Sequence, residues 1–208
     1  MPDLEYYQEC RNALRQANDI LLEKLPLHAN GRAALKSATK AIGIRIGLDP
    51  SLMDRLYEFT LYEPTLSGMI WARCALDSYD SFAALEREVV EAALRAEPSV
   101  FEVTEVNRAD RTLCLRDLLR DRPDIWIVDL NLSQTARARG LLFCRPIDMG
   151  SVCFASGATI AFGPDNKAMV LRNAVKLDRI KNDPLRRRKQ FAMFLELEKH
   201  SSVAMVYK

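Results

Sequence analysis

The hydrophobic periodicity of this chain changes at Pro98, and this change restricts the folds that the chain can adopt. Up to Pro98, apolar residues recur at three- and four-residue steps, as on the buried face of a helix. They then alternate over short runs, as in half-buried strands, until about residue 166, where helical spacing returns. The sequence predicts an α+β protein with a helical region 1–98, a small antiparallel β-barrel-like region 99–166 and basic C-terminal helices 167–208. These helices are expected to pack back on the rest and form one cooperative unit with it.

Proline and capping residues mark the ends of the predicted helices. Pro26 ends a first amphipathic helix that begins near Leu4. Asp49 and Pro50 form a helix start, because Asp accepts backbone N–H groups and Pro fits the first turn without losing a bond. Asp80 or Ser81 is expected to cap the last helix before Pro98. Further helices are predicted at residues 31–42, 69–76 and 169–180, and from a second Asp-Pro start at Asp183.

Short apolar runs separated by turn residues predict the strands of the β-barrel-like region. Five or six short strands in about 65 residues favour an antiparallel sheet curled into a small barrel, because closure removes exposed edges. The strands are expected around residues 101–104, 113–115, 125–128, 141–144, 152–154 and 159–162. Their aromatic residues occur in apolar contexts that suit a core: Phe101, Trp126, Phe143 and Phe154. The segment Val203 to Tyr207 is either a final strand or a docked tail.

A segment of this region is similar to a known set of proteins. The matching residues are Val100 to Val103, Leu113 to Leu118, Val128 to Asp129, Ser133, Gly140 to Arg145 and Ser156 to Gly157. From Val100 to Gly157 the chain resembles a barrel-like region of uncharacterised bacterial proteins, some of which end in a SEC-C zinc-binding tail. The cysteine cluster of that tail is missing here. The resemblance therefore implies a fold, without zinc binding and without an activity to transfer.

Two features bear on the compartment of the protein. The first ten residues carry three acids and are followed by no apolar run, unlike a signal peptide, and nowhere are 18 consecutive residues apolar. We therefore expect a cytoplasmic protein with no membrane partner. The five cysteines are far apart and form no C-x-x-C pair, so they are predicted to be buried, reduced and unlinked: Cys10, Cys74, Cys114, Cys144 and Cys153. No metal and no other cofactor is expected.

Few residue patterns point to catalysis. His28 and His200 are the only histidines, and a surface or capping role is expected for both. Cys144 or Cys153 could act as a nucleophile only beside a histidine, and both lie within apolar strands, where a thiol stays protonated and inert. The chain contains no glycine-rich phosphate-binding motif.

Three aspartates at predicted strand ends, Asp117, Asp129 and Asp148, supply an alternative acidic site. Clustered carboxylates bind metal ions or perform acid–base catalysis, so they would suit a small-molecule or metal-dependent enzyme. Strand ends are also where aspartate stabilises turns. Asp117 could cap a turn in this way, or Arg116 could pair with Asp129 across strands.

The charge of the chain is unevenly distributed. Residues 1–100 carry 11 basic and 15 acidic side chains, a net charge of −4, whereas residues 167–208 carry 11 and 4, a net charge of +7. The candidate partner-binding residues lie in this basic end: Arg172, Lys176, Arg179, Lys181, Arg186, Arg187, Arg188 and Lys189. They either pair with the acidic N-terminal half or meet an external anionic partner.

Arginines also occur throughout the β-barrel-like region, but nine acids lie among them, which makes this region a weak nucleic-acid surface. These arginines are Arg108, Arg111, Arg116, Arg120, Arg122, Arg137, Arg139 and Arg145. The sequence thus favours a non-enzymatic interaction or regulatory protein that binds another macromolecule, either a protein or a nucleic acid.

Overall fold

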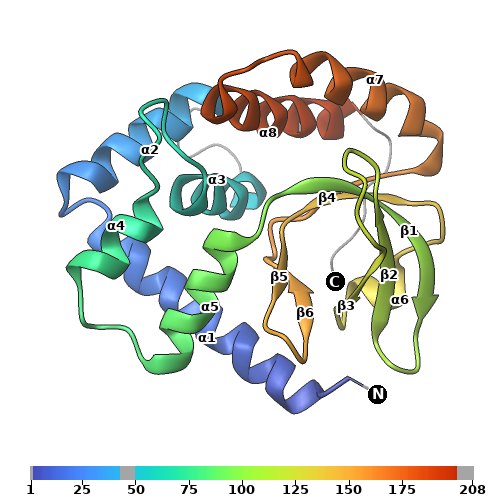
Figure 1. Ribbon diagram of the computed structural model, residues 1–208, viewed down its shortest axis with the longest axis horizontal. Helices are drawn as coiled ribbons and strands as arrows, with labels where there is room; N and C mark the ends of the chain where they lie inside the picture. Colours follow the sequence, from blue (N-terminus) through green and yellow to red (C-terminus); the bar gives the residue numbers. More distant parts are fainter. Residues whose placement is uncertain (1, 43–49, 201–208) are drawn as a thin grey trace. The chain divides into compact units, whose positions relative to one another are not determined.

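The computed structural model describes residues 2–42 and 50–200. The chain divides into two compact units that are each assembled from distant segments. Unit 1 comprises residues 1–7, 96–176 and 193–208, and unit 2 comprises residues 8–95 and 177–192. Three of the four boundaries between the units fall inside helices, namely α1 (Leu4–Lys24), α7 (Lys167–Asp178) and α8 (Asp183–His200), which Figure 1 labels; the fourth follows residue 95.

Unit 2 is helical, as the sequence predicts. Besides parts of α1, α7 and α8 it contains α2 (Ala29–Ile42), α3 (Pro50–Tyr62), α4 (Trp71–Ser78) and α5 (Ala84–Arg95). Its core includes Leu21, Leu56, Phe59 and Trp71, all fully buried. The indole N–H of Trp71 donates to the Leu21 carbonyl at 3.0 Å, so this large side chain is buried without an unpaired polar group.

The helix ends agree with the sequence in most places. α1 ends two residues before Pro26, and α3 begins at Pro50; Asp49 lies outside the described residues. The prediction that Asp80 or Ser81 caps α5 is wrong, because α5 begins at Ala84. Glu86 Oε2 instead accepts the backbone N–H of Ala83 at 2.8 Å, which is half of a capping box.

α8 begins at Asp183 as predicted, but its cap is the preceding residue. Asn182 Oδ1 accepts the backbone N–H of Leu185 at 2.9 Å. Asp183 lies in the first turn, where a negative charge is favourable to the helix dipole. The predicted tail Val203 to Tyr207 lies outside the described residues.

Unit 1 contains an antiparallel sheet of five strands in the order β3-β2-β1-β4-β7. These strands are β1 (Ser99–Asn107), β2 (Thr112–Asp117), β3 (Ile125–Val128), β4 (Leu141–Cys144) and β7 (Ile160–Phe162). The short strands β5 (Pro146–Asp148) and β6 (Cys153–Ala155) form a separate two-stranded sheet. Among the described strands the sheet does not close on itself, so the predicted closure into a barrel is not found. β3 is an edge strand of this sheet, and β6 lies beside it without joining its hydrogen-bond ladder. The edge of the sheet at β3 is therefore covered by packing and not by closure into a barrel.

The two faces of the five-stranded sheet are covered differently. One face carries an apolar cluster that includes Val103, Leu115 and Ile127. The short helix α6 (Leu132–Thr135), which the sequence did not predict, contributes Leu132 to this cluster. On the other face, Phe194 of α8 lies against Phe143 and Phe162, with ring centroids 4.4 and 6.1 Å apart. The C-terminal helix therefore packs on the sheet, as predicted.

The turn between β1 and β2 marks one end of the five-stranded sheet. Because the strands are antiparallel, β1 ends, β2 begins, β3 ends and β4 begins at this end, which we call the hairpin end (Figure 1).

Within the described part of the chain, no helix is both long and apolar enough to cross a bilayer.

Candidate functional site

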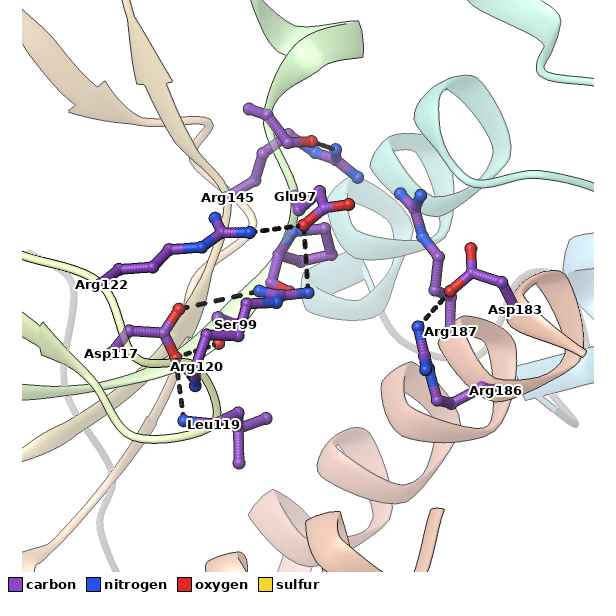
Figure 2. A network of polar contacts seen from close by, with 12 residues as sticks. Glu97, Ser99, Asp117, Leu119, Arg120, Arg122, Arg145, Asp183, Arg186 and Arg187 are labelled. Atoms are coloured by element: carbon purple, nitrogen blue, oxygen red, sulfur yellow. Dashed lines mark hydrogen bonds and ion pairs between the residues drawn. The ribbon is translucent and has the colours of Figure 1, made fainter. Parts of the chain in front are cut away.

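The basic run at the start of α8 is largely used inside unit 2. Arg186 pairs with Asp183 one turn earlier, as Figure 2 shows. Arg187 donates two hydrogen bonds to the Glu63 carboxylate, from Nε to Oε2 at 2.6 Å and from Nη2 to Oε1 at 3.1 Å. The Glu63 side chain is only 2% exposed and that of Arg187 is 18% exposed. This bidentate pair is therefore a buried structural contact and leaves Arg187 no free face for a partner.

Arg188 is the most buried cation of the run. It donates to the backbone carbonyl of Ser37, and its guanidinium carbon lies 5.5 Å from the ring centroid of Phe59. Burial lowers the pKa of Arg188, and the nearby Glu63 carboxylate opposes this shift. An arginine remains charged under such conditions, so its hydrogen bond and its ring contact replace the lost hydration.

The other five candidate partner-binding residues are exposed. Arg172 and Lys176 lie one turn apart on α7, Arg179 and Lys181 follow in the connection to α8, and Lys189 lies on α8. Among the residues that the structure describes, none of these side chains has a hydrogen bond or an ion pair. The structure thus separates the eight predicted residues into three that are engaged within the fold and five that are accessible.

The alternative acidic site is dispersed in unit 1. Asp117 ends β2 at the end of the sheet opposite the hairpin end, and Asp129 follows β3 at the hairpin end. Asp148 ends β5 in the separate two-stranded sheet. No group of three or more potential metal ligands occurs among residues 2–42 and 50–200. The three carboxylates are not brought together.

Each of these aspartates instead stabilises a turn or a helix start. Asp117 Oδ1 accepts the backbone N–H of Leu119 at 2.9 Å, as one of the sequence alternatives proposed. Asp129 Oδ1 accepts the backbone N–H of Leu132 at the start of α6, at 2.8 Å. Asp148 Oδ1 accepts the backbone N–H of Gly150 in the β5–β6 turn, also at 2.8 Å. The predicted Arg116–Asp129 pair is not formed, because Arg116 pairs with Asp124 across the β2–β3 connection, at 2.8 Å.

Asp117 also belongs to a polar network in unit 1 (Figure 2). Ser99 Oγ donates to its Oδ1 at 2.6 Å, and Arg120 lies 3.7 Å from its Oδ2. Arg120 and Arg122 both contact Glu97 Oε2, at 3.4 and 2.8 Å. This network connects the chain before β1 with the chain after β2. Its arginines have partners within the fold, which favours a structural role over a binding role.

The remaining titratable candidates also have structural surroundings. His28 Nδ1 accepts the backbone N–H of Asn30 at 3.1 Å, and its ring lies 5.4 Å from that of Trp71. The side chain of His200 lies outside the described residues. None of the five cysteines forms a disulfide. Cys10, Cys114 and Cys144 are buried, but Cys74 and Cys153 are only partly buried, which corrects the prediction that all five are buried.

The thiols give a first testable expectation. Burial raises the pKa of Cys153 to about 12, and the nearby Asp148 carboxylate adds to the shift. At pH 8 only about one Cys153 in ten thousand is then a thiolate. With Ellman's reagent on the native protein at pH 8, we expect one early reaction, at Cys74, and none at Cys153 until denaturant is added. Cys74→Ser should remove the early reaction; rapid modification of two thiols at pH 8 contradicts this expectation.

The eight arginines of residues 99–166 fall into two groups that the sequence could not distinguish. Four have partners: Arg116, Arg120, Arg122 and Arg145. Four are exposed, and their side chains have no hydrogen bond or ion pair among the described residues: Arg108, Arg111, Arg137 and Arg139. The prediction that Trp126 belongs to the core is also wrong. Its position in β3 places it on the face opposite Ile127, and it is 47% exposed.

Some of these residues carried a signal in the sequence and others did not. Strict alternation in β3 puts Trp126 and Ile127 on opposite faces, so one of them had to face away from the core. The partners of Arg187 and Arg188 lie 124 and 151 residues away along the chain, and no local pattern indicates such pairs.

Comparisons with known proteins give one match. The model of a Family of unknown function (DUF7986) matches residues 1–208. This family is neither a SEC-C family nor a barrel family. The match therefore supports the resemblance found in the sequence only as far as an uncharacterised protein. No curated protein and no solved structure matches the chain.

Proposed function

We propose that this chain, which belongs to the DUF7986 family of unknown function, is a non-enzymatic interaction protein that binds an anionic macromolecule. One observation carries the proposal. Arg172, Lys176, Arg179, Lys181 and Lys189 are exposed and have no partner among the described residues, although the chain has acids available. Arg172 and Lys176 belong to unit 1 and the other three to unit 2, and the free cations of each unit attract anionic partners.

The alternative, an enzyme that uses strand-end carboxylates, has less support. Asp117, Asp129 and Asp148 are separated and each holds backbone N–H groups. A carboxylate that accepts backbone N–H groups of a turn is fixed by these hydrogen bonds. General acid–base catalysis instead needs a carboxyl group that can face a substrate. The free cysteines fit a reducing compartment, and we place the binding function in the cytoplasm on that basis.

The proposal predicts a binding affinity that depends on salt through the five exposed cations. When all five are changed to Gln, the slope of log affinity against log salt should become shallower by up to about 4, because each lost phosphate contact releases about one counterion fewer. The measurement is fluorescence anisotropy of a labelled 20-nucleotide single-stranded oligonucleotide and of a labelled 20-residue polyglutamate, between 50 and 200 mM NaCl.

A matched control variant removes the same charge elsewhere. Arg15, Lys36, Lys40, Arg73 and Arg95 are also exposed and have no hydrogen bond or ion pair among the described residues. Their joint change to Gln should leave the slope for either probe nearly unchanged. Equal losses in the two variants, or no salt-dependent binding of either probe by the unmodified protein, would exclude this function for the five cations.

A further inference from the structure

We propose that the hairpin end of unit 1 is a separate binding surface for single-stranded nucleic acid, formed by Trp126 and by the four unpaired arginines Arg108, Arg111, Arg137 and Arg139. This surface lies on different residues from the five cations of the proposed function. It narrows the anionic partner of the proposed function to single-stranded nucleic acid. Binding at this surface does not require the C-terminal cations, so the two proposals can be tested separately.

The backbone brings the four arginines to the same end of the sheet. Arg108 and Arg111 belong to the turn between β1 and β2. Arg137 and Arg139 lie between α6 and β4, where the backbone N–H of Arg139 donates to the Val103 carbonyl at 2.7 Å. This bond continues the pairing of β1 with β4 toward the hairpin end. In Figure 1, α6 lies beside the β1–β2 hairpin, in agreement with these contacts.

Hydrogen bonds hold the backbone of this surface in place. Asp110 and Asn107 bond to each other across the turn, with the Asp110 N–H donating to Asn107 Oδ1 at 3.1 Å. The Arg111 carbonyl accepts the N–H of Asp129 at 3.0 Å, which fixes the turn to the end of β3. The Gly140 N–H donates to the Arg137 carbonyl at 3.0 Å. The arginine side chains thus project from positions that are fixed before a ligand binds, which lowers the entropy lost on binding.

Arginine occupies two backbone positions where other residues cost less. Arg111 has a φ of 60° and Arg139 a φ of 67°, in the left-handed region that glycine and asparagine adopt more readily. Both side chains are exposed and have no hydrogen bond, ion pair or ring contact with a described residue. A guanidinium group offers paired N–H donors that match phosphate oxygens, so arginine at these two positions is suited to bind phosphate groups.

The acids near this surface are mostly engaged. Asp110 accepts from the side-chain amide of Asn107 at 2.8 Å, and Asp129 accepts from the backbone at the start of α6. Asp124 is paired with Arg116. Glu105 of β1 is exposed without a described partner. Neutral N–H donors leave Asp110 and Asp129 charged, so the four unpaired guanidinium groups lie near three carboxylates that no cation neutralises, and the arginines are in excess by one.

Trp126 supplies the group that distinguishes nucleic acid from other polyanions. It lies opposite Cys114 in the β2–β3 ladder, two residues from Val128, which pairs with Thr112 at the hairpin end. The Arg111 carbonyl accepts the N–H of Asp129, three residues after Trp126, so Trp126 lies about 10 Å along the strand from the position of Arg111. The Trp126 ring has no ring or cation–π contact with a described residue. Trp126 lies on the face of the sheet opposite Ile127, and the arginines extend from the hairpin end. An exposed indole in this position can stack on an unpaired base while the arginines contact phosphates further along the same strand of nucleic acid.

Tryptophan emission provides a direct test, because the second tryptophan of the chain, Trp71, is fully buried and reports little on surface ligands. The probe is a 12-nucleotide oligo(dT), titrated into the full chain at 50, 100 and 200 mM NaCl. We expect it to quench the emission of Trp126, with a salt-dependent affinity. The 12-base-pair dT·dA duplex should quench far less, because its bases are already stacked and paired.

Two variants separate stacking from phosphate contacts. Trp126→Ala should weaken oligo(dT) binding about fivefold to a hundredfold, measured by anisotropy of a labelled oligonucleotide. The joint change of Arg108, Arg111, Arg137 and Arg139 to Gln should make the salt slope shallower by up to about 3. Gln retains Cβ, so the cost of the positive φ is unchanged. Trp126→Phe is the conservative control and should keep most of the affinity.

Each outcome decides between the two proposals. If the hairpin-end variants lose oligo(dT) binding and the five-cation variant keeps it, the hairpin-end surface is supported and the C-terminal cations do not contribute to oligo(dT) binding. If only the five-cation variant loses binding, the hairpin-end proposal is overturned and the earlier proposal stands. Absence of Trp126 quenching, equal quenching by the duplex, or polyglutamate binding as tight as oligo(dT) also overturns the assignment to single-stranded nucleic acid.

Discussion

Arg187→Met is expected to lower the free energy of unfolding by about 3–5 kcal/mol, because it leaves the Glu63 carboxylate buried without its partner. The cost of an uncompensated buried charge exceeds what the ion pair itself contributes. Urea unfolding can be followed by the fluorescence of Trp71, which lies in the same unit, in a Trp126→Phe background. The midpoint should fall while the slope with urea concentration stays the same.

Two further variants test the cause of this loss. Lys189→Met lies two residues later on α8, is exposed, and should change stability by less than about 0.5 kcal/mol. Glu63→Gln combined with Arg187→Met removes both charges and should recover a large part of the loss, as a double-mutant cycle would measure. A stability of Arg187→Met within about 0.5 kcal/mol of the unmodified protein would show that the pair is not a buried structural contact.

Phe194→Ala is the second change with a large expected effect, a loss of about 3–5 kcal/mol. Phe194 is fully buried and lies against Phe143 and Phe162, so truncation leaves a cavity over β4 and β7. Hydrogen exchange measured by mass spectrometry should show faster exchange in peptides that cover these two strands.

The size of the side chain at position 194 should set the effect. Phe194→Leu fills much of the space and should cost less than about 1.5 kcal/mol. Val175→Ala removes an exposed apolar side chain from α7 and should have little effect on stability. If Phe194→Ala leaves exchange in β4 and β7 unchanged, the contact of α8 with the sheet does not stabilise unit 1.

The order and type of the elements could be predicted from the sequence because they depend on local patterns. Pro26 ends α1 and the period change at Pro98 marks the start of β1. Closure of the sheet could not be predicted, since alternation fixes which residues face the core but not which strands pair. β5 and α6 were missed because segments of three and four residues are too short to show a period.

The candidate site was predicted less completely, for a related reason. Composition located the surplus of cations after residue 167 and raised the possibility of pairing with the N-terminal half, of which Arg187 and Glu63 are an instance. It could not separate Arg188, which is buried, from Lys189, which is exposed, because neighbouring residues of a helix point in different directions. Trp126 was assigned to a core because its neighbours are apolar, although alternation places it on the opposite face from Ile127.

The use of α8 in both units has a consequence for how the protein is made. During synthesis, Glu63 leaves the ribosome 124 residues before Arg187, and Phe143 and Phe162 also precede Phe194. Both units therefore stay incomplete until α8 emerges, since each draws part of its core from this helix. Until then the nascent chain carries a carboxylate without its partner and an uncovered aromatic face. Folding of such a chain depends on contacts between distant segments that form late, and apolar surface stays exposed until they form.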